Sequence, residues 1–240
     1  MTGSRSPIRD QLTLDFVGWD HFNFEAFESG PNAVALSQLR AVAEGRRENL
    51  VVSGPSGVGK THLLVSLCTQ AEQLGQPAVY APLKELVEHG PKIIEPLHER
   101  AYVCLDDVDY VLDSPDWRAA LFNLWNNCDA TGAVCVFSSA LSPANYHSGL
   151  PDLDSRLRSA LSLALKPLGD EGRAKAMKRI ADSYGFELND EVVRFLLVRI
   201  PRDMTSLAMT VEAIDKRSLA LKRRVTVPLV RSWLEMGLIP

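Results

Sequence analysis

The stretch NLVVSGPSGVGKTHLLVSLCT, residues 49–69, decides the fold of this chain. An apolar run, LVVS, precedes a glycine-rich loop, and an apolar-faced run, HLLVSLC, follows it. This order predicts a buried strand, a turn and a helix that begins at Lys60. The loop fits the pattern G-x-x-x-x-G-K-[ST], with Gly54, Gly59, Lys60 and Thr61 in the fixed positions. The pattern is typical of a loop that holds a polyphosphate.

Each residue type in the loop suits that ligand. Gly54, Gly57 and Gly59 allow backbone conformations with positive φ, which turn consecutive N–H groups toward phosphate oxygens. Lys60 would bring a positive charge to the β and γ phosphates, and Thr61 would offer a hydroxyl to Mg²⁺ at the positive end of the helix. We therefore predict that ADP or ATP with Mg²⁺ binds at Gly54, Pro55, Ser56, Gly57, Val58, Gly59, Lys60, Thr61 and His62. Kinases, GTPases, helicases and regulatory ATPases all share such a loop.

Two further apolar runs end in polar side chains. AYVCLDD, residues 101–107, predicts a buried strand with Asp106 and Asp107 at its carboxyl end. After a P-loop strand, the first carboxylate is expected on the Mg²⁺ side and the second is expected to orient or deprotonate the attacking water. AVCVFSS, residues 133–139, ends in two hydroxyls. Ser138 is a candidate sensor of the γ-phosphate, and a plain turn is the equal alternative.

Composition places limits on the function. The chain has 240 residues, 46% hydrophobic and 23% charged, enough for one core with a small second domain. A net charge of −4 argues against a protein that coats nucleic acid unaided, so any DNA contact is expected to be indirect. The four cysteines show no C-x-x-C spacing. Without a signal peptide or membrane-length apolar run, we predict a cytoplasmic protein that does not bind membranes.

The pattern of segments predicts an α/β fold. Five apolar strands alternate with helices, which indicates a P-loop parallel five-stranded sheet flanked by helices. From Pro167 onward the sequence predicts helices at residues 170–184, 190–199 and 202–221, and a last helix with Thr226 as its cap and Pro228 in its first turn. The predicted parts are an N-terminal tail (1–20), a nucleotide-binding domain (21–166) and a small helical lid domain (167–240).

The predicted tail contains a second motif. Gln11 is followed by spaced apolar residues, Leu12, Leu14 and Phe16. This pattern resembles the peptide by which many bacterial proteins bind the hydrophobic pocket of the DNA sliding clamp. The alternative is a short strand that packs on its own domain.

Together these features resemble the AAA+ ATPases, and within them the branch of the replication initiator DnaA and its regulatory relative Hda. The residues that carry the resemblance are 24–27 with Asn32, 54–61, 104–108, 150–157, 195–197 and 225–228. It covers almost the whole chain and implies an ATP-binding negative regulator of DNA replication initiation. Such a regulator, with the DNA-loaded sliding clamp (the DNA polymerase III beta subunit), stimulates hydrolysis of the ATP bound to DnaA.

The resemblance assigns Arg156 as an arginine finger, which reaches into a neighbour's nucleotide. Alternatives are a surface pair with Asp152 one helical turn earlier, and Arg158 as the finger. The lid position that commonly carries a nucleotide-sensing arginine falls at Thr205, with Arg202 the nearest substitute. Residues near Ser139 also depart from the relatives, which tend to have an aspartate there. We therefore expect weak intrinsic hydrolysis.

Other functions stay open. DnaA carries a C-terminal DNA-binding domain, for which a chain that ends at Pro240 is expected to have no room. An autonomous AAA+ ATPase such as a helicase loader is the main alternative. A DNA-binding fragment using the basic run 222–224 is disfavoured by the acidic overall charge. The sequence does not choose between ADP and ATP as the working ligand, or between a monomer and a homo-oligomer.

Overall fold

The computed structural model describes residues 22–221 and 224–240; for residue 221 it describes the backbone alone. Gln11, Leu12, Leu14 and Phe16 therefore lie outside the described residues. Packing divides the described chain into two compact units. The first contains residues 22–24, 34–55 and 60–165, and the second contains residues 25–33, 56–59, 166–221 and 224–240.

The first unit is built on a parallel sheet, which in the described part has five strands in the order β2-β3-β4-β1-β5. Their bounds are Leu50–Ser53 (β1), Ala78–Pro82 (β2), Tyr102–Asp106 (β3), Val134–Ser139 (β4) and Leu161–Ala164 (β5). The predicted five-stranded parallel sheet is confirmed. Because neighbouring strands run in one direction, the carboxyl ends of β3, β4 and β1 lie side by side at one edge.

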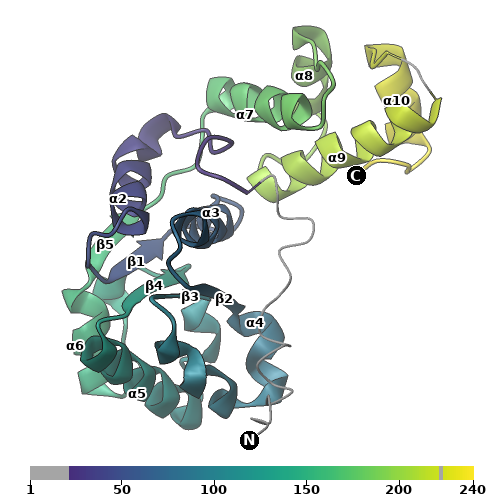
Figure 1. Ribbon diagram of the computed structural model, residues 1–240. Helices are drawn as coiled ribbons and strands as arrows, with labels where there is room; N and C mark the ends of the chain where they lie inside the picture. The colour runs from purple at the N-terminus through teal and green to yellow at the C-terminus, as the bar shows by residue number, and fades with distance from the viewer. Residues whose placement is uncertain (1–21, 222–223) are drawn as a thin grey trace, which may run out of the picture. The chain divides into compact units, whose positions relative to one another are not determined.

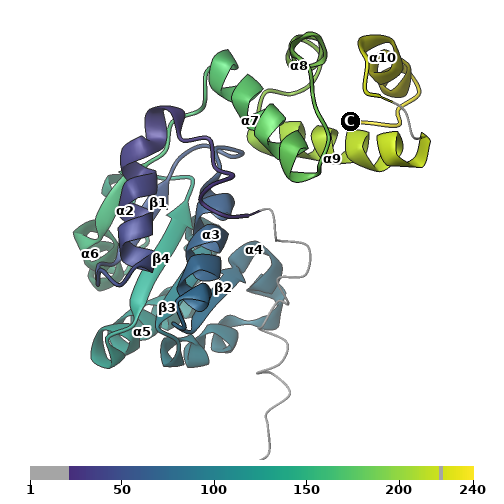
Figure 2. The ribbon, with the colours of Figure 1, turned by 45° about the horizontal axis from the view of Figure 1, so that its top comes forward.

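Helices cover both faces of this sheet (Figures 1 and 2). On one face lie α2 (Ala33–Ala43) and α3 (Lys60–Gln73), and on the other α5 (Pro115–Thr131) and α6 (Pro151–Ser159). A short α4 (Leu83–Leu86) follows β2. The 3₁₀ turns of this unit are η2 (Val87–His89), η3 (Pro91–Glu99), η4 (Val108–Val111) and η5 (Pro143–Asn145).

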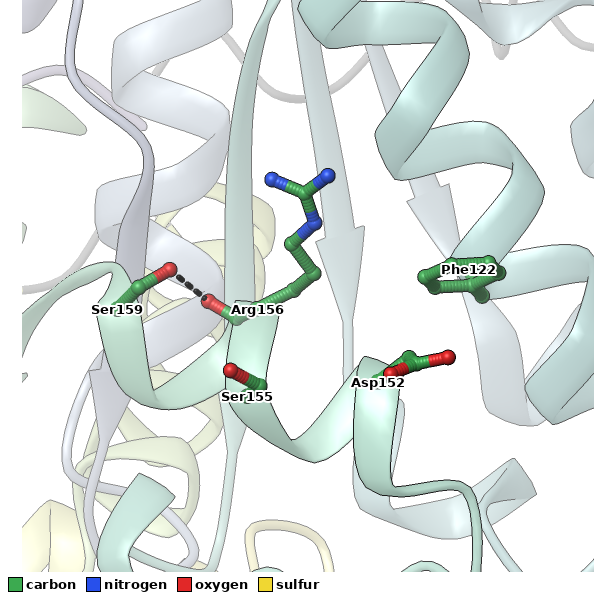
Figure 3. Close-up of a pocket in the computed structure, with 5 residues that line it drawn as sticks. All are labelled: Phe122, Asp152, Ser155, Arg156 and Ser159. Carbon is green, nitrogen blue, oxygen red and sulfur yellow. Dashed lines mark hydrogen bonds between the residues drawn. The ribbon is translucent and has the colours of Figure 1, made fainter.

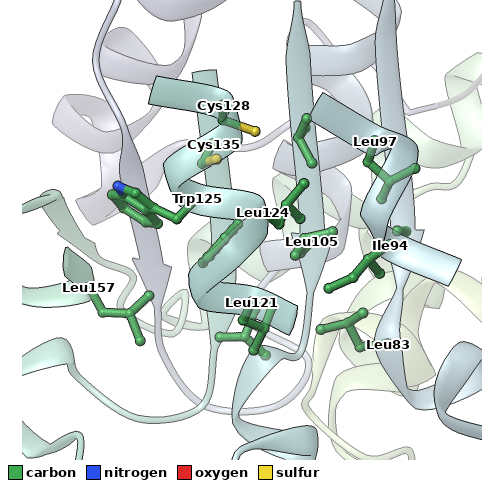
Figure 4. Close-up of a cluster of buried hydrophobic side chains, with 14 of the residues drawn as sticks. Leu83, Ile94, Leu97, Leu105, Leu121, Leu124, Trp125, Cys128, Cys135 and Leu157 are labelled. Carbon is green, nitrogen blue, oxygen red and sulfur yellow. The ribbon is translucent and has the colours of Figure 1, made fainter. Parts of the chain in front are cut away.

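One hydrophobic core lies between the sheet and α5 (Figure 4). Trp125 packs edge-on against Phe137 of β4, with ring centroids 5.4 Å apart. Leu105 of β3 belongs to the same buried cluster. Since side chains alternate between the faces of a strand, Asp106 and Ser138 point to the opposite face, which α3 covers.

The second unit is helical. It contains η1 (Gly30–Asn32), α7 (Asp170–Ser183), α8 (Asp190–Leu197), α9 (Met204–Leu221) and α10 (Val227–Glu235). Its core includes Met177, Leu196, Val211 and Trp233, so the predicted C-terminal helical domain has a core of its own.

Helix α8 ends at Leu197 rather than at residue 199, and two further details at helix starts in this unit differ from the predictions. Helix α9 begins at Met204 rather than Arg202, because the Asp203 carboxylate accepts the Ser206 N–H at 2.9 Å and so caps the helix. Thr226 occupies the N-cap position of α10, but its side chain makes no capping hydrogen bond. No helix in the described part of the chain combines the length and apolar character needed to span a membrane.

Candidate functional site

The lysine of the loop, Lys60, lies against the loop's own backbone. Lys60, the first residue of α3, is 7% exposed. Its Nζ donates to the carbonyl oxygens of Gly54 at 2.9 Å and Pro55 at 3.2 Å. The predicted strand, loop and helix are thus confirmed, and the ammonium group lies where the loop leaves β1.

Residues 56–59 of the loop pack with the second unit. Gly57 has φ +69° and Gly59 has φ +101°. A Cβ added to Gly57 would lie 2.7 Å from Cβ of Asp203, and one added to Gly59 would lie 2.8 Å from a ring carbon of Phe27. Both positions therefore require glycine for backbone conformation and for space.

A buried carboxylate is the centre of the polar cluster in the first unit. Asp106 is 3% exposed, and hydroxyls from three elements donate to it. Thr61 Oγ1 and Tyr80 OH donate to Oδ2 at 2.6 and 2.8 Å, and Ser138 Oγ donates to Oδ1. The structure thus brings together Thr61, Asp106 and Ser138 from three separate sequence motifs. Sequence reasoning missed Tyr80, because a tyrosine in the apolar run AVYA is typical of a core position.

The donor set at Asp106 fits a hard divalent cation. Mg²⁺ prefers oxygen ligands and usually binds through one or two protein groups, with phosphates and water completing its shell. Thr61 and Asp106 would hold it here. Among the described residues, no group of three or more His, Cys, Asp or Glu side chains is placed to hold a metal ion.

Asp107 is held by two contacts. It adopts a left-handed conformation, φ 56° and ψ 50°, unlike every other non-glycine residue of the described chain. Its N–H donates to Ser138 Oγ at 2.9 Å, and its carboxylate pairs with Lys84 Nζ at 2.7 Å. The hydrogen bond to Asp107 raises the pKa of Lys84. The side chain predicted to act on water is therefore paired with a lysine that no sequence motif indicated.

His62, predicted to contact the nucleotide, is turned toward the segment before α2. Its Nε2–H donates to the Asn23 carbonyl at 2.9 Å, and its ring lies 5.0 Å from the Phe22 ring. Burial lowers the pKa of His62, so the imidazole is neutral near pH 7. The role of His62 in nucleotide binding stays a prediction.

Arg156 lies on α6 beside an open hollow of about 320 Å³. Figure 3 shows its guanidinium pointing away from Asp152. The other residues that line the hollow are Phe122, Asp152, Ser155 and Ser159. The Arg156 side chain is 45% exposed, so it does not enter the core.

The guanidinium of Arg156 binds α5 rather than its own helix. It donates to Asp129 Oδ2 at 3.3 Å and to Asn126 Oδ1 at 3.1 Å. The sequence offered an ion pair between Arg156 and Asp152 as an alternative, but Arg156 contacts Asp129 and Asn126 instead. Arg158 is equally exposed, but it donates to the Tyr146 carbonyl at 2.8 Å and lies 3.6 Å from Asp154 Oδ2. In the second unit, Arg202 lies 3.5 Å from Asp170, and Thr205 is exposed.

The fold and the loop together define a P-loop ATP-binding protein of the AAA+ class. The chain belongs to the family of IstB-like ATP-binding proteins, whose model matches residues 17–162. The model of the Hda lid domain matches residues 170–234. The combination identifies a DnaA/Hda-type AAA+ protein, as the sequence resemblance predicted.

Solved structures agree on the fold. Domain III of the DnaA replication initiation protein from Thermotoga maritima is 21% identical, with a TM-score of 0.80 over 92% of this chain and 98% of that one. AMPPCP-bound DnaA from Aquifex aeolicus is 19% identical, with a TM-score of 0.67 over 85% of this chain and 68% of that one. The RuvB Holliday junction branch migration motor of Thermotoga maritima is 16% identical, with a TM-score of 0.62 over 83% and 67%.

Proposed function

We propose that this protein is a negative regulator of DNA replication initiation that acts on the ATP of a DnaA-type partner. With the DNA-loaded sliding clamp, it completes the partner's active site through Arg156 and leaves the partner bound to ADP. Its own loop holds ADP or ATP with Mg²⁺, which stabilises the chain rather than serving as its main substrate.

The exposed guanidinium of Arg156 carries this proposal. A finger must be accessible to a second protein, and the side chain of Arg156 is 45% exposed beside an open hollow. Its bonds to Asp129 and Asn126 are exposed to solvent, so they contribute about 1 kcal/mol or less each. A triphosphate offers a denser negative charge at closer range and would displace them.

The site of the chain itself supports weak intrinsic hydrolysis. Lys60, Thr61 and Asp106 supply the groups that bind phosphate and Mg²⁺ in P-loop proteins. The Asp107 carboxylate, however, is paired with Lys84 at 2.7 Å. A carboxylate engaged by an ammonium group is a poorer base for the attacking water.

The test measures conversion of ATP to ADP on a DnaA-type protein supplied with this chain, the sliding clamp and DNA. We expect fast conversion with all components and a return to the basal rate when the clamp is omitted. The double variant Gln11→Ala, Leu12→Ala should give the same basal rate as the reaction without the clamp. It should also fail to capture the clamp in a pull-down. If the double variant stimulated ATP conversion as fully as the wild type, the proposed binding of the clamp by the N-terminal segment would be wrong.

An autonomous AAA+ ATPase is the second candidate, favoured by the likeness to the RuvB motor. This function requires that the isolated protein hydrolyses ATP rapidly and that Lys60→Ala abolishes this hydrolysis. Slow turnover of the isolated chain, combined with stimulation of the partner, would exclude it.

A further inference from the structure

The three hydroxyls at Asp106 come from different directions. Thr61 lies on α3, Ser138 ends β4, and Tyr80 lies on β2 at the outer edge of the sheet. All three meet a carboxylate that is 3% exposed. A carboxylate removed from water is stable only when its oxygens accept hydrogen bonds, so each donor also determines how the group is oriented.

Strand pairing explains how Tyr80 reaches this carboxylate. In the register of β2 and β3, Tyr80 lies beside Cys104, two residues before Asp106. Residues two apart on a strand share a face, so Tyr80 and Asp106 are diagonal neighbours on the face covered by α3. The phenol ring bridges this diagonal, and its hydroxyl lies 2.8 Å from Oδ2.

The other two donors each have a second role at this site, whereas the Tyr80 hydroxyl acts here through its bond to Asp106. The Thr61 hydroxyl is the group expected to face Mg²⁺, and Ser138 Oγ also accepts the N–H of Asp107. Burial and the charge of Asp106 raise the pKa of the Tyr80 phenol, so it remains a protonated donor at every physiological pH. A rigid aromatic ring on a strand loses few rotamers when its hydroxyl is held in place.

We propose that Tyr80 is a positioning residue for the Mg²⁺-nucleotide site. Its phenol keeps the Asp106 carboxylate in the orientation in which Oδ2, the oxygen that also accepts from Thr61, lies toward the Thr61 hydroxyl and the water shell of the metal. The proposal rests on the proposed binding of nucleotide with Mg²⁺ and extends it to a residue outside the loop. Partners of metal ligands typically change metal affinity by about 10- to 100-fold when they are removed.

The test titrates Mg²⁺ against binding of a fluorescent ADP analogue to the isolated protein. Tyr80→Phe keeps the ring and removes only the hydroxyl. We expect the Mg²⁺ midpoint to rise by about tenfold or more, while binding in EDTA stays within about twofold of the wild type.

Tyr102→Phe is the matched control. Tyr102 begins β3, is 5% exposed like Tyr80, and donates its hydroxyl to the Val42 carbonyl at 2.9 Å. We expect this variant to leave the Mg²⁺ midpoint unchanged. Ser138→Ala, which removes the donor to Oδ1, should also raise the midpoint and provides a second test if Tyr80→Phe does not fold.

Three results would overturn the proposal. One is an unchanged Mg²⁺ midpoint for Tyr80→Phe, and another is an equal loss of affinity with Mg²⁺ and with EDTA, which indicates a purely structural role. The third is the failure of the wild-type chain to bind the analogue at all, which would also remove the nucleotide site. The assay contains no partner protein, so its outcome is independent of the role proposed for Arg156.

Discussion

The ion pair between Lys84 and Asp107 determines the state of one side chain at the site. Lys84 lies on α4, directly after β2, and its ammonium group is 2.7 Å from the Asp107 carboxylate. The Lys84 side chain is 56% exposed, so the pair contributes little to stability. Its effect on chemistry is larger, because it occupies the carboxylate expected to orient the attacking water.

We predict that Lys84→Met raises the ATP turnover of the isolated chain. An increase of about three- to tenfold is expected, which is modest beside the ~10²–10⁴-fold contribution of a general base. Phosphate release measures it, and Asp107→Asn should abolish the gain. Lys216→Met is the control, because Lys216 pairs in the same way with Glu212 on α9, at 2.6 Å. Lower turnover in Lys84→Met would show that the lysine assists hydrolysis instead.

The effect of Lys84 should not depend on pH near neutrality. The hydrogen bond to Asp107 raises the pKa of Lys84 above its ordinary value of 10.5. A raised lysine pKa means that the charged pair is fully present below the ordinary value and is lost only as pH rises through the higher one. The ratio of variant to wild-type turnover is therefore expected to be constant between about pH 6 and 9.

Sequence reasoning at this scale succeeded where a motif specifies the residue and failed where a contact joins distant segments. Thr61 and Asp106 are adjacent as the motifs predicted. Tyr80 and Lys84 were missed, because each meets its partner only through the pairing of β2 with β3 or through the turn that follows β2. Arg156 was considered with Asp152 one turn away, yet it binds Asn126 and Asp129 on another helix.

Helix ends account for part of the stability of the second unit. Asn189 caps α8, and its Oδ1 accepts the Val192 N–H at 2.9 Å. Loss of such a cap typically costs about 1 kcal/mol. Helix α8 supplies Val192, Leu196 and other residues to the core of this unit, so fraying at its start exposes that core.

We predict that Asn189→Ala lowers the free energy of local opening of α8 by about 1 kcal/mol, which corresponds to about fivefold faster amide exchange. Hydrogen exchange of the α8 amides measures the change. Asn127→Ala, on the exposed side of α5, is the control and should alter stability by less than about 0.5 kcal/mol. Equal effects of the two substitutions would show that the cap contributes nothing.

Element boundaries were predictable to the extent that local signals define them. Helix α7 ends at Ser183, one residue before its predicted end, and α10 has Pro228 in its first turn as predicted. The start of α9 was missed, because the Asp203 cap competes with Arg202 for the first position. The sequence did not predict that residues 25–33 and 56–59 would pack with the helical unit, since such packing depends on tertiary contacts.

The whole molecule combines an ATP-binding family fold with a match to the Hda lid domain. The fold class was predictable because five apolar strands and the loop leave few alternatives to a parallel sheet covered on both faces. The proposed function depends on a second protein, so this chain alone would supply only part of the proposed catalytic site. A net charge of −4 is consistent with partners that are proteins rather than bare DNA.

The central claim is that Arg156 acts on ATP held by another protein. A single-turnover experiment would preload labelled ATP on either a DnaA-type partner or this chain, remove free nucleotide and then mix the two proteins with clamp and DNA. We predict rapid conversion of the label on the partner, slow conversion of the label on this chain, and a loss of about 10³-fold in the partner's rate with Arg156→Ala. Arg158→Ala, equally exposed on the same helix, should retain the wild-type rate. Conversion of the partner's ATP by Arg156→Ala at the wild-type rate would contradict the account.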